Sequence, residues 1–161
     1  MGKYHMSNRP NREIKSEEQI IELLEKGKYV TISLCKDSQP YIVTLSYGYD
    51  KDTNSLYMHC AKNGLKLDFI RANAKACDTV IEDGGYIYNE CGHWYKSLVL
   101  WGEISILTNT DEKRKGMEII LNHLETDNDF IKKKLDSDIK LYQDLVVLKY
   151  VINEIHGKSG R

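Results

Sequence analysis

The chain has 161 residues, of which 41% are hydrophobic and 29% are charged, and this composition predicts one soluble domain with its own core. Its 23 basic and 24 acidic side chains give a formal net charge of −1, which gives no reason to expect nucleic acid or a membrane as partner. No apolar run is long enough to span a bilayer, and residues 1–15 contain no signal-peptide core, so we expect a cytoplasmic protein.

The first part of the chain is predicted to be an arm followed by a helix. Residues 1–12 are polar and basic, which is typical of a flexible arm, and the folded domain is expected over residues 13–158. Ser16 and Gln19 have the spacing of a capping box, so Ser16 is the expected N-cap of a helix that Gly27 ends.

Three strands and a short helix are predicted next. Two β-rich runs, 29–34 and 41–49, are joined through the five turn-forming residues 36–40 and therefore predict a hairpin. A third strand ends at His59, and the segment 65–73 has the apolar spacing of a short helix.

The second half of the chain adds further strands and helices. A strand over 76–82 is expected to break at Asp83-Gly84-Gly85, and Tyr86 to Trp94 has no regular pattern. The remaining predictions are a strand over 96–107, a helix over 111–122 with Thr110 as N-cap, a polar helix over 127–135, and a strand over 145–155. Together these elements indicate a mainly β protein with peripheral helices, built as a six-stranded antiparallel barrel.

The turn between the third strand and the short helix is the most informative segment. Lys62 and Lys66 flank Gly64 at the start of the helix, where the macrodipole disfavours cations and favours anions. Two lysines, a glycine and free backbone N–H groups fit together if a phosphate binds between them. The same residues also fit a solvated basic turn, and spacing alone does not choose between the two interpretations.

Other candidate residues have two interpretations as well. His59 ends a strand beside this turn and is either a structural histidine or a proton donor, because its side chain titrates near neutrality. Tyr47 and Tyr49 either line a flat ligand or pack in the barrel. The same choice applies to Trp94, Tyr95 and Trp101.

Several protein classes are excluded. The sequence has no G-x-S-x-G elbow, no G-x-G-x-x-G fingerprint and no Walker-type lysine turn, which argues against serine hydrolases and against nucleotide-binding folds of those types. Four cysteines without C-x-x-C spacing are expected to be reduced thiols, and Cys91-Gly92-His93 has no second cysteine–histidine pair for structural zinc.

The order of these segments resembles the nitroimidazole-resistance (Nim) flavoproteins, a branch of the pyridoxamine 5′-phosphate oxidase-like FMN-binding split barrels. The likeness runs from about Arg12 to Lys158. It is carried by Gln39-Pro40-Tyr41, Val43-Thr44-Leu45-Ser46-Tyr47, the run from Leu56 through His59-Cys60-Ala61-Lys62-Asn63-Gly64-Leu65-Lys66 to Asn73, Tyr95-Lys96-Ser97 to Ile104, and Glu154 to Lys158.

The resemblance implies a homodimer of six-stranded split barrels with one FMN per subunit at the dimer interface. Matching positions imply a phosphate site at Lys62, Gly64, Leu65 and Lys66; a flavin ring along Val43, Thr44, Leu45 and Ser46 with His59, Cys60 and Ala61 beside it; and a hydrogen bond from Ser97. His59 matches the family's active-site histidine. Thr44 stands where the family often has proline, and Cys91-Gly92-His93 is unusual, so the flavin contacts and the substrate preference are expected to differ.

The implied activity is that of an FMN-dependent oxidoreductase. A reduced donor such as NAD(P)H would supply electrons that pass to a small planar acceptor such as a nitroaromatic ring, with His59 positioning the acceptor or giving a proton. One alternative is a non-catalytic flavin carrier or redox sensor. The other alternative is a haem-binding split barrel with His59 or His93 as ligand. The basic turn argues against it, because the turn favours phosphate over porphyrin.

Overall fold

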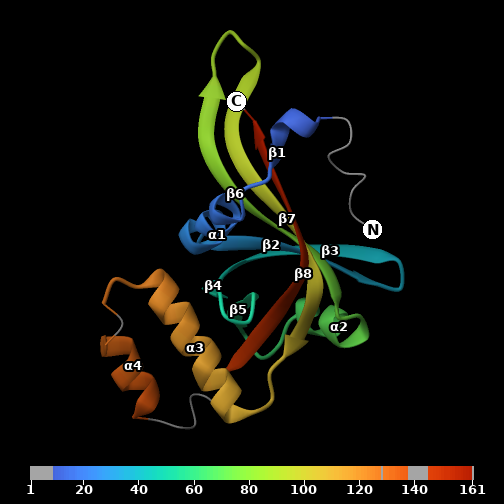
Figure 1. Ribbon diagram of the computed structural model, residues 1–161. Coiled ribbons are helices and arrows are strands. Elements are labelled where there is room, and N and C mark those ends of the chain that lie inside the picture. Colours follow the sequence, from blue (N-terminus) through green and yellow to red (C-terminus); the bar gives the residue numbers. More distant parts are fainter. Residues whose placement is uncertain (1–8, 128, 138–144, 161) are drawn as a thin grey trace.

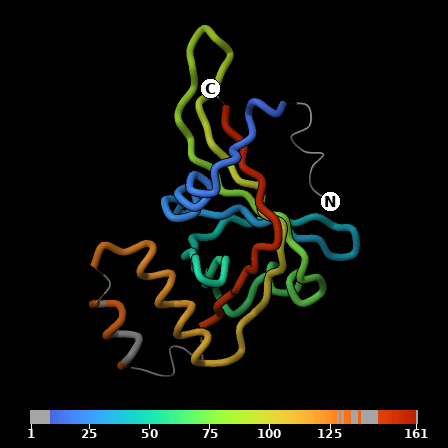
Figure 2. The backbone as a smooth tube through the Cα atoms, in the orientation of Figure 1, coloured from blue at the N-terminus to red at the C-terminus, as the bar shows by residue number. Residues whose placement is uncertain are grey.

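The computed structural model describes residues 9–127, 129–137 and 145–160, and it is dominated by one strongly curved antiparallel sheet (Figure 1). The helices lie around this sheet, with α3 and α4 side by side at one end of the molecule. At the other end two strands project beyond the body as a hairpin, which is also clear in the backbone trace (Figure 2). The strands are β1 (Glu13–Ile14), β2 (Tyr29–Lys36), β3 (Gln39–Ser46), β4 (Gly48–Asp50), β5 (Ser55–Cys60), β6 (Lys75–Ile87), β7 (Gly92–Ile106) and β8 (Val146–Gly160). The helices are the 3-10 turn η1 (Pro10–Arg12), α1 (Glu17–Lys26), α2 (Leu65–Ala72), α3 (Thr110–Leu124) and α4 (Asp129–Asp136).

The strand order across the sheet is β3-β2-β6-β7-β8-β5-β4, and β1 pairs with the far end of β8. All pairings are antiparallel, and β3 and β5 also approach each other although they are not paired. The sheet is curled but not closed, which is the split barrel predicted from the sequence. The six predicted strands are confirmed, and the short β1 and β4 complete the sheet of eight.

The core lies inside the curled sheet because successive residues of each strand point to opposite faces. On β2 the buried Val30, Ile32 and Leu34 alternate with more exposed neighbours. The helix α1 packs against β6 and β7 and buries Leu23 and Leu24 in the core. Its first turn is capped by Ser16, whose side chain accepts a hydrogen bond from the Gln19 N–H (3.3 Å). The N-cap at Ser16 and the stop at Gly27 are confirmed.

The predicted break after residue 82 is wrong. The strand has a bulge between Asp83 and Gly85, with Gly84 as the extra residue. Gly85 has φ +93° and donates its N–H to the Asp83 carboxylate (2.8 Å). Pairing then continues to Ile87 and Gly92, so that residues 83–95 form the projecting hairpin, here called the arm. A bulge accommodates the extra residue without ending either strand.

Two smaller differences concern the predicted boundaries. The cap of α3 is Asn109, whose side chain accepts hydrogen bonds from Asp111 N (2.9 Å) and Glu112 N (3.1 Å), so the prediction of Thr110 as cap is wrong. The predicted strand 41–49 is interrupted at Tyr47, which is fully buried and donates a hydrogen bond to the Leu24 carbonyl (2.7 Å). Of the flexible N-terminal segment predicted over residues 1–12, residues 1–8 lie outside the described residues.

Candidate functional site

The start of α2 has the features of an anion site. Its N-cap is Gly64, and no side chain caps the helix. The Nζ atom of Lys66 lies 3.2 Å from the position that a Cβ on Gly64 would occupy, so its ammonium group lies over the turn. The Lys66 charge also opposes the increase in pKa that burial causes at the Cys60 thiol, which places this charge near the end of β5 as well. Unbonded N–H groups of a helix N-terminus beside an ammonium group favour a bound anion.

The four predicted residues of β3 divide between the two faces of the sheet. Val43 and Leu45 pack against the core, whereas Thr44 is exposed and Ser46 is half-buried on the outer face. The Thr44 hydroxyl lies 2.9 Å from the Thr31 hydroxyl on β2, and the two are hydrogen-bonded. Because β3 is the terminal strand of the sheet path, its outer backbone edge is available for polar contacts with a ligand.

The end of β5 brings His59 close to the turn. His59 is exposed and pairs with Val147 of β8, whereas Cys60 is half-buried and packs against the core. Ala61, Lys62 and Leu65 are exposed. The structure therefore brings His59, the turn and the start of α2 into one continuous segment that faces solvent.

Ser97 does not join this group within one chain. It pairs with Lys158 on β8, whereas His59 pairs with Val147. The two partners on β8 are eleven residues apart, which is about 35 Å of extended strand. Ser97 instead shares the outer face of the sheet with Thr44 and Ser46.

That outer face also carries exposed apolar side chains. Tyr29 and Ile42 are each 65% exposed and Ile81 is 61% exposed, and each lies on the face opposite the core. Trp101 is 39% exposed on the same face, opposite Cys77. Large apolar side chains clustered on one face are typical of an interaction surface.

The aromatic residues singled out in the sequence differ in burial, and Tyr95 is half-buried. Tyr47 is a core residue, and Tyr49 is half-buried and donates a hydrogen bond to the Asn54 side chain (3.2 Å). Trp94 and Trp101, in contrast, are exposed enough to contact a ligand or another molecule. On the arm, His93 is hydrogen-bonded to the Asp83 carboxylate at 2.6 Å. The Gly85 N–H, and to a smaller degree His93, keep the pKa of Asp83 below its usual value.

Two cavities lie away from the predicted flavin residues. One, of about 590 Å³, lies at the base of the arm, and the other, of about 460 Å³, lies against Trp101 on the outer face. Neither is lined by a predicted cofactor-binding residue. The first is formed in part by Arg12 and Lys96, which sequence reasoning missed because they meet only through the pairing of β1 with β8 and of β8 with β7.

A family model described as pyridoxamine 5′-phosphate oxidase matches residues 16–159. The chain belongs to the pyridoxamine 5′-phosphate oxidase family. The match includes the β3 strand, the β5–α2 turn and Ser97. No curated protein sequence matches this chain at a significant level.

Solved structures show the same fold. A candidate 5-nitroimidazole antibiotic resistance protein of Bacteroides thetaiotaomicron is 20% identical, with a TM-score of 0.78 over 92% of this chain and 86% of the other. An FAD- and haem-binding protein of Mycobacterium smegmatis is 20% identical (TM-score 0.73; 93% and 74% covered), and an FAD-binding protein of Mesorhizobium loti is 22% identical (TM-score 0.66; 92% and 96% covered). The chain therefore shares its fold with a protein of the kind that the sequence resembles. Within the described residues, no helix is long and apolar enough to cross a membrane.

Proposed function

We propose that this protein binds FMN at the β5–α2 turn and acts as an oxidoreductase of the Nim type. The observation that carries the proposal is the uncapped start of α2 with the Lys66 ammonium group over Gly64. A phosphate there would receive backbone N–H donors and a charge-assisted bond from Lys66. Membership in a family named for an oxidase supports flavin binding and redox chemistry at this coarser level.

The flavin ring would lie against the edge strand β3, with the Thr44 and Ser46 side chains and the strand's backbone as polar contacts. When bound, the flavin would supply the electron transfer, and the protein would orient it and the acceptor. His59 would hold a small planar acceptor, such as a nitroaromatic ring, or give it a proton. The expected donor of electrons is NAD(P)H.

The site is completed by a second copy of the chain in this proposal. The β8 partner of Ser97 lies eleven residues beyond that of His59, so in this proposal the contact from Ser97 comes from the partner subunit. The exposed apolar residues Tyr29, Ile42 and Ile81 share the outer face with Ser97 and would be covered in such a dimer. A groove between two subunits would also explain why neither cavity described above is lined by a predicted flavin residue.

The first experiment is to purify the protein without added cofactor, record its visible spectrum and identify what heat releases. A yellow protein that yields FMN supports the proposal. If FAD is released instead, the phosphate bound at the turn would belong to a dinucleotide. A Soret band would favour haem, as in the Mycobacterium smegmatis protein. A colourless protein that takes up no flavin would refute the proposal.

Turnover separates the enzyme from a carrier or sensor. Steady oxidation of NADH or NADPH by the flavin-loaded protein, with a nitroaromatic acceptor present, supports the enzyme. His59→Ala is expected to keep most of the flavin and to lower turnover. Flavin reduction by the donor without turnover would favour the sensor.

A further inference from the structure

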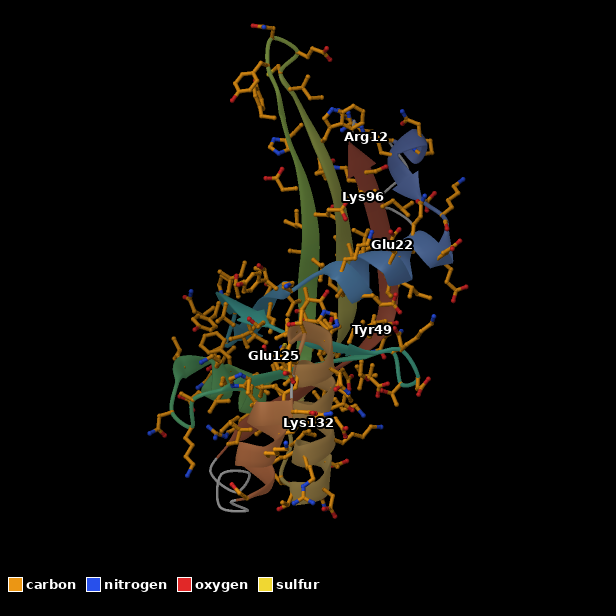
Figure 3. All side chains as sticks on the ribbon, turned by 90° about the vertical axis from the view of Figure 1, so that its left-hand side faces the viewer. Arg12, Glu22, Tyr49, Lys96, Glu125 and Lys132 are labelled. Carbon is orange, nitrogen blue, oxygen red and sulfur yellow. The ribbon has the colours of Figure 1, made fainter. Side chains whose placement is uncertain are left out.

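The cavity at the base of the arm lies outside the proposed flavin site. Its volume is about 590 Å³, which is within the range of small-molecule pockets. Figure 3 shows Arg12 and Lys96 one above the other on this side of the molecule, with Glu22 of α1 beyond them. The cavity is lined by Asn11, Arg12, Glu82, Gly84, Trp94, Tyr95, Lys96, Ser159 and Gly160.

The wall that carries Arg12 is fixed to the sheet. Arg12 ends η1, and the next residue, Glu13, pairs with Lys158 of β8. The Ser159 hydroxyl also donates a hydrogen bond to the Arg12 carbonyl (3.5 Å). The guanidinium group is therefore carried by backbone that is bonded to the strand forming the cavity floor.

The charges of the cavity favour an anion. Within the part of the chain that the structure describes, no carboxylate lies within ion-pair distance of the half-buried Arg12 side chain. Lys96 has one partner, Glu82, at 3.6 Å on the neighbouring strand. Glu22 pairs with Lys26 and is also attracted to Lys96, but it does not line the cavity. Two cations against one lining carboxylate leave a net positive charge, and a guanidinium group offers the forked donors that suit phosphate.

An aromatic surface lies next to these cations. Trp94 is 52% exposed, which leaves much of its indole available for contact with a ring. It faces Gly84 across the hairpin, where a Cβ would lie only 2.8 Å from the Trp94 Cβ, so the glycine allows this close approach. An exposed indole beside an arginine and a lysine is the combination that binds nucleotides by stacking and phosphate contacts.

We propose that this cavity binds a nucleoside phosphate, with the base on Trp94 and the phosphate on Arg12 and Lys96. The ligand would be either a free nucleotide or the nucleotide half of a dinucleotide such as NADP⁺. No residue of the predicted flavin site lines the cavity, so this proposal goes beyond the function proposed above and does not require it.

The test is calorimetric titration of the purified protein with ADP, with the flavin content recorded. We expect saturable binding that Arg12→Gln weakens about tenfold or more, through loss of a charge-assisted phosphate contact. Trp94→Leu is expected to weaken it by a similar factor, through loss of base stacking. Inorganic phosphate and adenosine should each bind more weakly than ADP.

Lys15→Gln is the matched control, because Lys15 is exposed, lies near Arg12 in the chain and pairs with Glu13. It should leave the ADP affinity unchanged. Displacement of ADP by NADP⁺ would identify the dinucleotide as the source of the nucleotide, and its failure would identify the free nucleotide. The proposal is overturned if ADP shows no saturable binding, or if both folded variants bind it as well as the parent does. Folding of each variant is checked by circular dichroism.

Discussion

Asp78 is a carboxyl group buried in the core, and its replacement by a side chain that does not ionise should stabilise the protein at neutral pH. It lies on β6 facing the barrel interior, is 1% exposed, and neither of its side-chain oxygens has a hydrogen-bond partner among the described residues. The nearby Tyr150 hydroxyl donates to the carbonyls of Leu100 (2.8 Å) and Ala76 (3.3 Å) instead. Burial raises the pKa of Asp78 to about 8, and attraction to the Ser33 N–H offsets this only in part.

The sign of the pH dependence follows from this raised pKa. Below pH 3.8, the ordinary value, Asp78 is protonated whether the chain is folded or not. Between that pH and about 8 the unfolded chain has lost the proton and the folded chain keeps it, so stability falls as pH rises. One pKa unit corresponds to about 1.36 kcal/mol, and pH 7 lies about three units above the unfolded value, so the loss there is on the order of 4 kcal/mol.

Asp78→Asn tests the reasoning because asparagine has the same shape and does not ionise in this range. We expect the variant and the parent to be about equally stable near pH 4 and the variant to be more stable at pH 7. The assay is urea denaturation followed by circular dichroism at several pH values, at one protein concentration because a dimer's stability depends on it. Asp78→Leu should stabilise the protein as well. Its gain would be smaller by about 1–3 kcal/mol if the branched side chain overpacks the site.

Asp83→Asn is the matched control on the same strand. Asp83 is exposed and its pKa is lowered by the Gly85 N–H and His93, so its substitution should give no gain at neutral pH. An unchanged pH dependence in Asp78→Asn would refute the argument, because it would mean that Asp78 is already ionised with a partner inside the barrel.

Three further predictions concern other parts of the chain. Asn109→Ala should cost about 1 kcal/mol by removing the cap of α3, whereas Thr110→Ala should cost little, as urea denaturation of the two would show. Gly102→Ala should destabilise the sheet by more than the roughly 0.5–3 kcal/mol of most single substitutions, because the new Cβ would clash with the Val151 carbonyl oxygen; a normal melting temperature would contradict this. Lys66→Ala should weaken FMN binding by roughly 1.5–3 kcal/mol, as measured by fluorescence titration. An unchanged FMN affinity would refute the phosphate site.

The sequence predicts those features that depend on neighbouring residues. The alternation of Val30, Ile32 and Leu34, the cap at Ser16 and the turn at Gly64 are local, and the structure has the strands and helices that they predict. The break predicted at Asp83 is wrong because the outcome depends on pairing: β6 stays paired with β7 beyond the bulge, which neighbouring residues alone do not predict. The interruption at Tyr47 likewise depends on a hydrogen bond to α1, 23 residues earlier.

In the candidate site, too, some relations between residues are local in sequence and others depend on the fold. His59 and Lys66 are near each other because they are near in sequence, and their grouping needs no knowledge of the fold. The position of Ser97 depends on two strand registers, from β7 to β8 and from β8 to β5, and only the structure gives them. It is this register that separates Ser97 from His59 and puts it beside exposed apolar side chains. If both residues contact one flavin, cofactor binding and dimer formation are coupled, and flavin should raise the stability of the dimer as well as that of the fold. Equal dimer dissociation with and without flavin, measured by sedimentation, would show that Ser97 has no part in the site.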